Sequence, residues 1–527
     1  MKKQKKANNL ILSFAGLFFL TSVLFAQDAD FYIYLCFGQS NMQGQGTIQS
    51  RDKTENSRFK TFQALDCSNL NREKETWYTA VPPTCQCYSH LSPADYFGRT
   101  MAANLPDSIT IGIINVSVAG CDIRLFDKDI YQEYDSTYTD NWFTSLVAAY
   151  DWNPYQYLVN LAKLAQNDGI VKGILLHQGE TNTGNSLWLS YVKKIYNDML
   201  TDLSLNADSV PLLAGELLSA PGNCCSSMNT IINRLPDTIP TAYVISSSGC
   251  PGQDEAHFDT EGNRKIGRRY AVQMLSLMGY ESVYAEAECG TVGNNLHILA
   301  DNNASNTAYV TAVKSITASP ADDADIIKMS VSVVTDTNFC LYGRFNNSKA
   351  SHNAFWLKID DAEFEFYDNM FTNGWEWLEL KSFELTAGEH TFSFAFAEDS
   401  VMLDKIAVKN SQITPVDVGE EAVNLCEADI TTSNIDLNLE GYALEQNYPN
   451  PVTKRNVSIP FKIPDTGFVS LKIFNALGID IDEPAGKVFY AGDHVIEYNL
   501  EKLSPGIYFY TMKTGNYSAT RKMIITD

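Results

Sequence analysis

A serine near the start of the chain and a histidine far downstream have the residue types that nucleophilic catalysis requires. Ser40 lies in the sequence Gly-Gln-Ser-Asn-Met, and His257 closes an Asp-Glu-Ala-His sequence that begins at Asp254. A serine hydroxyl is a weak nucleophile at neutral pH, so it needs a neighbouring base, and the base needs a carboxylate that fixes its tautomer. Ser40, His257 and Asp254 therefore form a candidate catalytic triad, in which one loop supplies both the carboxylate and the imidazole.

The residues before Ser40 predict how its side chain is positioned. Residues 31–37 are a continuous apolar and aromatic run, which is typical of a buried strand. Gly38 ends this run and favours a turn into a helix, whose first backbone N–H groups would face a developing oxyanion. An ordinary strand-to-helix turn with a serine cap is the alternative interpretation of this motif.

Two further apolar runs also end in small or polar residues. Residues 111–118 lead to Gly120, where the missing side chain would let a backbone N–H approach a substrate closely, and residues 171–176 lead into a His-Gln-Gly-Glu sequence that contains Gln178. Open α/β sheets bind ligands at the carboxyl ends of their strands. The backbone N–H groups of Ser40 and Gly120 and the side-chain amide of Gln178 are thus candidate oxyanion donors. A turn glycine and a solvated loop are the alternatives for these two segments.

The remaining histidines and the paired cysteines give weaker candidates. His90 and His177 also lie near the motifs, but His257 is preferred as the base because Asp254 accompanies it in the same loop. The sequences Cys-Gln-Cys at 85–87 and Cys-Cys at 224–225 do not have zinc-knuckle spacing, so disulfides or free thiols are expected there.

Four ordered blocks resemble the SGNH-type carbohydrate esterases, and most closely the acetylxylan esterases of carbohydrate esterase family 6 and the related sialate O-acetylesterases. The blocks are residues 38–42, 119–121, 177–180 and 254–257, and the resemblance covers about residues 30–280. One small departure is the Ala-Gly pair at 119–120, where relatives often have Gly-Gly.

This resemblance implies a role for each candidate residue. Ser40 would be the nucleophile, His257 the general base and Asp254 its orienting partner, with no metal or organic cofactor in the chemistry. The Ser40 N–H, Gly120 and Gln178 would form the oxyanion hole. Because the chain lacks the Gly-x-Asn-Asp block of other SGNH enzymes, Asn182 competes with Gln178 for the third position.

The beginning of the chain predicts export. Residues 1–26 combine four lysines, an apolar stretch over 10–25 and a small residue, Ala26, which together are typical of a cleaved signal peptide. An uncleaved anchor is the alternative, although the apolar stretch is short for a membrane span. We expect no later membrane-spanning segment and a secreted or cell-surface location.

Charge and cysteine content limit the partners. The net charge is −24, and removal of residues 1–26 with their four lysines takes it to −28, so nucleic acid and anionic membranes are excluded as expected partners. A neutral acetylated polysaccharide is compatible with this charge. Eleven cysteines in an exported chain predict disulfides with at least one thiol left unpaired or paired between chains.

The chain of 527 residues predicts a multidomain protein. Residues 27–281 alternate apolar runs with amphipathic helices over 155–166, 187–203 and 260–274, which predicts a three-layer α/β domain with a parallel sheet. Residues 283–410 change to short alternating strands, which predict a β-sandwich. Residues 411–440 are polar and without periodicity, as in a linker, and residues 441–527 predict a small C-terminal β-sandwich.

The two later domains resemble known modules. Residues 283–410 are similar to carbohydrate-binding modules of the family 6 and 35 type, which implies that Glu286, Glu288 and Asp404 hold a structural calcium, with surface carboxylates as the alternative. Trp375 and Trp377 alternate in one strand and are candidates for stacking on sugar rings or for core packing. Residues 441–527, with their Gln-Asn-Tyr-Pro-Asn-Pro sequence, resemble the C-terminal sorting domain of type IX secretion cargo, which implies the type IX secretion machinery as a partner.

Together these features predict a secreted serine esterase that removes O-acetyl groups from plant cell-wall polysaccharide, with acetylated xylan as the first candidate, through an acetyl-enzyme intermediate. Deacetylation of sialic acid or of another acetylated glycan is the alternative within the enzyme class. A secreted glycan-binding protein without activity is the alternative outside it.

Overall fold

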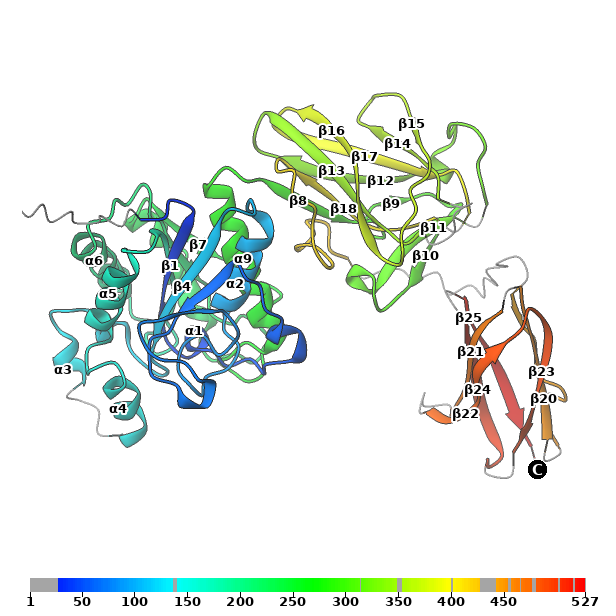
Figure 1. The fold of residues 1–527 in the computed structure, drawn as a ribbon, viewed down its shortest axis with the longest axis horizontal. Helices are drawn as coiled ribbons and strands as arrows, with labels where there is room; N and C mark the ends of the chain where they lie inside the picture. Colours follow the sequence, from blue (N-terminus) through cyan, green and yellow to red (C-terminus); the bar gives the residue numbers. More distant parts are fainter. Residues whose placement is uncertain are drawn as a thin grey trace, which may run out of the picture. The chain divides into compact units, whose positions relative to one another are not determined.

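A computed structural model describes residues 27–135, 140–312, 314–347, 353–399, 401–426, 442–453, 456–464, 466–475, 480–500, 503–514 and 517–526 (Figure 1). The predicted signal peptide, residues 1–26, lies outside the described residues. The same is true of residues 427–440 of the predicted linker and of residue 441.

The first domain is built on a seven-stranded sheet with the order β3-β2-β4-β1-β5-β6-β7. Neighbouring strands are parallel except for the antiparallel pair β2 and β3. The strands are β1 Phe31–Gly38, β2 Phe59–Phe62, β3 Trp77–Thr79, β4 Thr110–Ser117, β5 Ile170–His177, β6 Leu212–Gly215 and β7 Ala242–Ile245. The continuous apolar runs of the sequence thus form the buried central strands, because both faces of the sheet are covered.

Helices cover both faces of this sheet. Alternate residues of β1 enter two separate cores: Leu35 packs with residues of α5 and α6, whereas Tyr34 packs with residues of α2 and α9 (Figure 1). These helices are α2 Pro93–Asn104, α5 Pro154–Ala165, α6 Trp188–Asp202 and α9 Thr260–Leu277. The shorter helices are α1 Ser40–Gln43, α3 Tyr131–Asp135, α4 Asn141–Ala148, α7 Asn229–Ile232 and α8 Leu235–Thr238. The prediction of a three-layer α/β domain is confirmed.

The second domain consists of two antiparallel sheets, which confirms the predicted β-sandwich. One sheet has the order β10-β11-β18-β13-β16, with β8 paired to β18, and the other has the order β15-β14-β17-β12-β9. The strands are β8 Ser282–Glu286, β9 Thr291–Val292, β10 Leu296–Ala300, β11 Ala308–Ala312, β12 Ile327–Val333, β13 Thr337–Phe345, β14 Phe355–Ile359, β15 Glu365–Tyr367, β16 Glu376–Leu385, β17 Gly388–Phe396 and β18 Met402–Lys409.

The first half of the predicted linker is not a free connection. Lys265 and Arg269 of α9 form ion pairs with Glu421, and Cys426 forms a disulfide with Cys289. Residues 411–426 therefore pack against the domains that precede them. The linker prediction is corrected for these residues: they lack regular secondary structure, but ion pairs and a disulfide hold them in place.

The C-terminal residues form two further antiparallel sheets around their own apolar core. One sheet has the order β19-β20-β23 and the other β22-β21-β24-β25. The strands are β19 Ala443–Leu444, β20 Asn456–Ile463, β21 Gly467–Asn475, β22 Asp480–Phe489, β23 Gly492–Asn499, β24 Gly506–Thr514 and β25 Tyr517–Ile525. The predicted small β-sandwich is thereby confirmed.

Disulfides use six of the eleven cysteines. The pairs are Cys67–Cys87, Cys224–Cys225 and Cys289–Cys426, and the five remaining thiols are buried. The expectation that at least one thiol is left over agrees with this arrangement.

Candidate active site

The three residues of the candidate triad lie in a continuous hydrogen-bonded chain. Ser40 Oγ is 2.9 Å from His257 Nε2, and His257 Nδ1 is 2.8 Å from Asp254 Oδ2. Each ring nitrogen of His257 thus has a separate partner, so the Nδ1–H tautomer donates to the carboxylate while Nε2 accepts the serine proton. This arrangement can deprotonate the Ser40 hydroxyl during attack on a carbonyl carbon.

The loop between β7 and α9 holds Asp254 in its ionised form. Partial burial alone would raise the pKa of Asp254, but a hydrogen bond from the His257 ring and two from the backbone N–H groups of Ala256 and His257 outweigh it and lower the pKa. Both backbone donors reach Asp254 Oδ1, which leaves Oδ2 for the ring. The local Asp-x-x-His spacing thus lets one loop supply both the imidazole and the carboxylate that orients its ring.

Three neighbouring strands bring the other blocks to one edge of the sheet. Gly38 at the end of β1 lies opposite Ser117 of β4 and His177 of β5. The Gln39 N–H donates to His177 O at 3.0 Å, and the Val118 N–H donates to Gly38 O at 3.0 Å. The segments that follow β1, β4 and β5 are thus hydrogen-bonded to one another where the strands end. The predicted meeting of these blocks at the carboxyl ends of parallel strands is what the structure shows.

Two backbone N–H groups near Ser40 are free to bind an oxyanion. Neither the Ser40 N–H nor the Gly120 N–H donates a hydrogen bond to another described residue. Gly120 has a φ of 76°, in the region that favours glycine, and this conformation follows a bond from the Ala119 N–H to Gln43 Oε1. Both N–H groups are thus available for an oxyanion, and the roles expected of Ser40 and Gly120 stay predictions.

The structure corrects the expectation for Gln178. Its buried Nε2 lies 2.6 Å from Asn182 Oδ1 and 3.1 Å from both Gln39 Oε1 and Cys121 O, and its Oε1 accepts from the Trp188 indole. An amide nitrogen has two hydrogens, so these internal acceptors use both of them. Gln178 therefore ties the loops together and has no hydrogen left for an oxyanion.

In the competing residue, Asn182, the side-chain oxygen is the atom that makes hydrogen bonds within the site. Asn182 Oδ1 accepts from Gln178 and from the Ile123 N–H at 2.9 Å. Its buried Nδ2 makes no hydrogen bond of normal length to a described residue, although the amide is close enough to Asp122 to help Arg124 lower the pKa of that carboxyl. Of the two side-chain amides, Asn182 is thus the better candidate for a third donor.

Two residues of the site have roles that the motifs did not reveal. Asn41 is fully buried: its Nδ2 donates to Glu180 Oε1 at 2.7 Å and to Ala256 O at 3.0 Å, and its Oδ1 accepts from the Phe258 N–H at 3.1 Å. Burial raises the pKa of Glu180, although the hydrogen bond from Asn41 and the nearby His257 oppose this rise. Both residues belong to blocks that the sequence marked, but no spacing rule connects them to residues 256–258.

The other two histidines do not reach Ser40. His177 is buried between Phe258 and Tyr270, and burial lowers its pKa to about 3, so it stays neutral. His90 is exposed, and only its backbone is hydrogen-bonded to the turn after α1 among the described contacts. His257 is the histidine that the structure brings to the nucleophile.

The two tryptophans of the β-sandwich are engaged in internal packing. The Trp375 ring lies against Tyr309 at 5.4 Å, and its Nε1 donates to Asp301 Oδ2. The Trp377 ring lies against Tyr284 at 6.0 Å, and its Nε1 donates to Asp417 O. These contacts explain their partial burial without a ligand, so sugar stacking by Trp375 and Trp377 stays a prediction.

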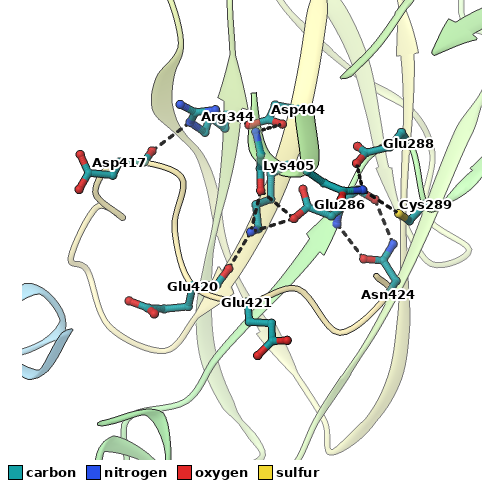
Figure 2. Close-up of polar contacts among 12 residues, drawn as sticks. Glu286, Glu288, Cys289, Arg344, Asp404, Lys405, Asp417, Glu420, Glu421 and Asn424 are labelled. Carbon is teal, nitrogen blue, oxygen red and sulfur yellow. Dashed lines mark hydrogen bonds and ion pairs between the residues drawn. The ribbon is translucent and has the colours of Figure 1, made fainter. Parts of the chain in front are cut away.

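Figure 2 shows the three carboxylates to which the sequence assigned a calcium, in surroundings that also contain two cations. Asp404 accepts from the Ser305 N–H and pairs with Arg344, and Lys405 Nζ lies 3.0 Å from Glu286 Oε1. The second oxygens, Oε2 of Glu286 and Oε2 of Glu288, are buried and have no hydrogen-bond partner among the described residues. Lys405 thus pairs with Glu286 as Arg344 pairs with Asp404, which leaves Glu288 as the carboxylate without a cation, and calcium binding by the three residues stays a prediction.

Family models match both ends of the described chain. Residues 30–276 match the model described as carbohydrate esterase, sialic acid-specific acetylesterase. Residues 446–526 match the model of a secretion system C-terminal sorting domain. The first match indicates a carbohydrate acetylesterase domain, and the second indicates export by the type IX machinery to the extracellular space or the cell surface.

Solved structures are similar to parts of the chain. A protein from Arabidopsis thaliana is 18% identical over 46% of this chain and 98% of its own, with a TM-score of 0.36. A family 35 carbohydrate-binding module from Clostridium thermocellum is 19% identical over 24% of this chain and 96% of its own, with a TM-score of 0.20. The C-terminal family 6 module of a laminarinase from Zobellia galactanivorans is 11% identical over 24% of this chain and 98% of its own, with a TM-score of 0.20.

Within the described residues, helices long and apolar enough to cross a membrane are absent.

Proposed function

We propose that the protein is an exported serine esterase that removes O-acetyl groups from a neutral plant cell-wall polysaccharide, with acetylated xylan as the first candidate. The observation that carries the proposal is the chain from Ser40 Oγ through His257 to Asp254, with distances of 2.9 and 2.8 Å, beside two free backbone N–H groups. A binding protein has no use for such a polarised hydroxyl.

The reaction follows from this geometry. Ser40 Oγ forms a bond to the acetyl carbonyl carbon while its proton moves to His257 Nε2, and the negative oxygen of the tetrahedral intermediate accepts from the Ser40 and Gly120 N–H groups. The bond from carbon to the sugar oxygen then breaks, and His257 returns its proton to that oxygen. Water repeats the attack on the acetyl-serine, and acetate leaves as Ser40 regains its proton.

The charge of the chain supports a neutral substrate. The exported protein has a net charge of −28 once residues 1–26 are removed, which repels a polyanion or a sialic acid carboxylate at long range. Arg124, four residues beyond Gly120, is already paired with Asp122 through its Nε and Nη2 atoms. Acetylated xylan lacks the carboxylate that a sialate presents, so these features disfavour the anionic substrate.

An acetylated sialic acid is the second candidate, because the matching family model is described by that specificity. The two candidates differ in the charge of the sugar that carries the ester. The hydrolysis of a sialate ester by this acidic protein should therefore depend on ionic strength. The hydrolysis of a neutral polysaccharide ester should depend on it only weakly.

Acetate release by the purified chain without residues 1–26 tests the proposal. We expect release from acetylated xylan, a slower rate on O-acetylated sialic acid, and loss of activity of about 10⁴-fold or more in Ser40→Ala. Thermal unfolding of the variant shows whether it is folded. Activity that survives in folded Ser40→Ala would contradict the assignment of Ser40 as the nucleophile. An inactive parent protein that still binds xylan would favour the glycan-binding alternative.

A further inference from the structure

An exposed tryptophan lies beside the candidate oxyanion hole. Trp142, in α4, has 57% of its surface exposed. The position that a Cβ atom would take on Gly120 is 3.5 Å from Trp142 Cζ3 and 3.6 Å from Trp142 Cη2. The six-membered edge of the indole thus borders the loop whose N–H faces the developing charge.

The helix that carries Trp142 is fastened to the same loop. Phe143, the next residue, is buried and packs edge-on against Tyr134. The Tyr134 hydroxyl accepts from the Asp122 N–H at 2.9 Å, two residues beyond Gly120. At the start of α4 the Trp142 N–H donates to Asp140 Oδ1, so both the helix and its first turn are fixed. The indole is therefore held near Gly120 by packing that does not involve the indole itself.

The contacts of the indole leave a large apolar face in solvent. Among the described residues, Trp142 Nε1 donates no hydrogen bond and the ring stacks on no other aromatic ring. A partly exposed aromatic ring at a fixed distance from a reactive centre is suited to a ligand with one apolar face and several polar edges. A pyranose ring has this character, because its C–H groups form an apolar face and its hydroxyl groups point outward.

We propose that Trp142 is a substrate-binding residue. The sugar ring that carries the acetyl ester stacks on the indole, and the carbonyl oxygen of this ester accepts from the Ser40 and Gly120 N–H groups. This inference deepens the proposed function and rests on it. The loop that contains Gly120 and the Trp142 ring would then bind the substrate together. The stacked sugar ring would set the direction from which the ester approaches Ser40. The substrate class is a neutral sugar ester with one face free of substituents.

Two substrates separate sugar binding from the chemistry. We expect Trp142→Ala to raise KM for an acetylated xylo-oligosaccharide about tenfold with a smaller change in kcat, because the lost contact acts mainly in binding. The hydrolysis of ethyl acetate, which has no ring to stack, stays unchanged in the variant. Trp142→Phe, which keeps an aromatic face, retains most of the affinity.

Trp152→Ala is the matched control, because Trp152 is a second exposed tryptophan, 49% exposed, in the same domain. It should leave both substrates unaffected. Equal losses on ethyl acetate and the oligosaccharide in Trp142→Ala would show that the indole only supports the Gly120 loop, and an unchanged KM would overturn the proposal. A parent enzyme that is inactive on both esters would instead contradict the proposed function.

Discussion

Asn41 holds the backbone on both sides of His257. Its side chain binds Ala256 O and the Phe258 N–H at 3.0 and 3.1 Å, so the residue next to the nucleophile also fixes the base. The distance between Ser40 Oγ and His257 Nε2 is therefore set by one short stretch of chain rather than by two independent loops. Because Asn41 is fully buried, these bonds do not compete with water.

Asn41→Ala should lower kcat by about 100-fold, because a shift of about 1 Å in a catalytic group can have such an effect. The KM for a small acetyl ester should change little, since the substrate need not touch Asn41. Steady-state kinetics on ethyl acetate measure this separation, with thermal unfolding as the measure of fold. A variant that is folded and as active as the parent would show that His257 is positioned by its own loop alone.

Glu180→Gln should separate stability from activity. Burial raises the pKa of Glu180, so the folded state favours the protonated acid, and the resulting stability is present at low pH and is lost as pH rises through the raised pKa. Gln keeps an oxygen that can accept from Asn41 but carries no charge. We expect the variant to unfold at a higher temperature than the parent at pH 8, with little difference at pH 4.

The activity of the same variant should fall, because the Glu180 charge stabilises a protonated His257, with which it interacts. We expect a decrease in kcat of about tenfold at pH 8. Glu421→Gln, which changes a carboxylate that pairs with Arg269, is the control for a general charge effect. A more stable and equally active Glu180→Gln would mean that the carboxylate has no electrostatic part in the reaction.

The triad could be predicted from the sequence because its pairing is largely local. Asp254 and His257 are three residues apart, and Ser40 follows a strand whose apolar run is unmistakable, so the chemistry and the sheet edge both follow from short patterns. The role of Gln178 could not be predicted in this way. Its amide hydrogens go to Gln39, Cys121 and Asn182, and only the folded structure brings the first two of these acceptors to it.

Two other features depend on contacts between distant segments. Trp142 is 22 residues beyond Gly120 and matches no motif, so its position beside the oxyanion loop follows only from the packing of Phe143 on Tyr134. Residues 411–426 have no periodicity, and the sequence therefore predicted a linker. In the structure, the side chains of Glu421 and Cys426 attach this segment to the domains before it. Cys426 was the one sign in the sequence of this attachment, because a cysteine of an exported chain often forms a disulfide.

Gly120→Ala tests the oxyanion donor by changing the backbone conformation that positions its N–H group. A methyl group at Gly120 would make ordinary contacts with Trp142, but the φ of 76° is unfavourable for alanine, so the loop and its N–H should shift. We expect kcat to fall by about 10²-fold or more, as for the loss of an oxyanion donor. Acetate release from ethyl acetate gives this value.

Gly184→Ala is the control for that substitution. Gly184 has a φ of 82° and nothing within 4 Å of the position that a methyl group would take, so it has a similar backbone cost with no neighbours to displace. Its thermal unfolding should shift as in Gly120→Ala while its activity is kept. An equal loss of activity in both variants would attribute the effect to destabilisation.

A bound calcium ion should stabilise the β-sandwich through Glu286 and Glu288. Their Oε2 atoms are buried and, within the described part of the chain, without hydrogen-bond partners, and burial raises the pKa of Glu288 to about 7, so at pH 8 the sandwich holds an uncompensated carboxylate. We expect chelation followed by calcium addition at pH 8 to raise the unfolding temperature of the sandwich in a concentration-dependent way. At pH 5 the effect should be smaller, because Glu288 is then protonated.

Glu288→Gln distinguishes this binding from a general salt effect. The amide keeps an oxygen that can accept from Asn306 and removes the charge, so the variant should be more stable than the metal-free parent at pH 8 and should respond less to calcium. Magnesium at equal concentration controls for ionic strength. If neither the parent nor the variant responds to calcium, Arg344 and Lys405 are sufficient to balance this cluster, because they already pair with Asp404 and Glu286.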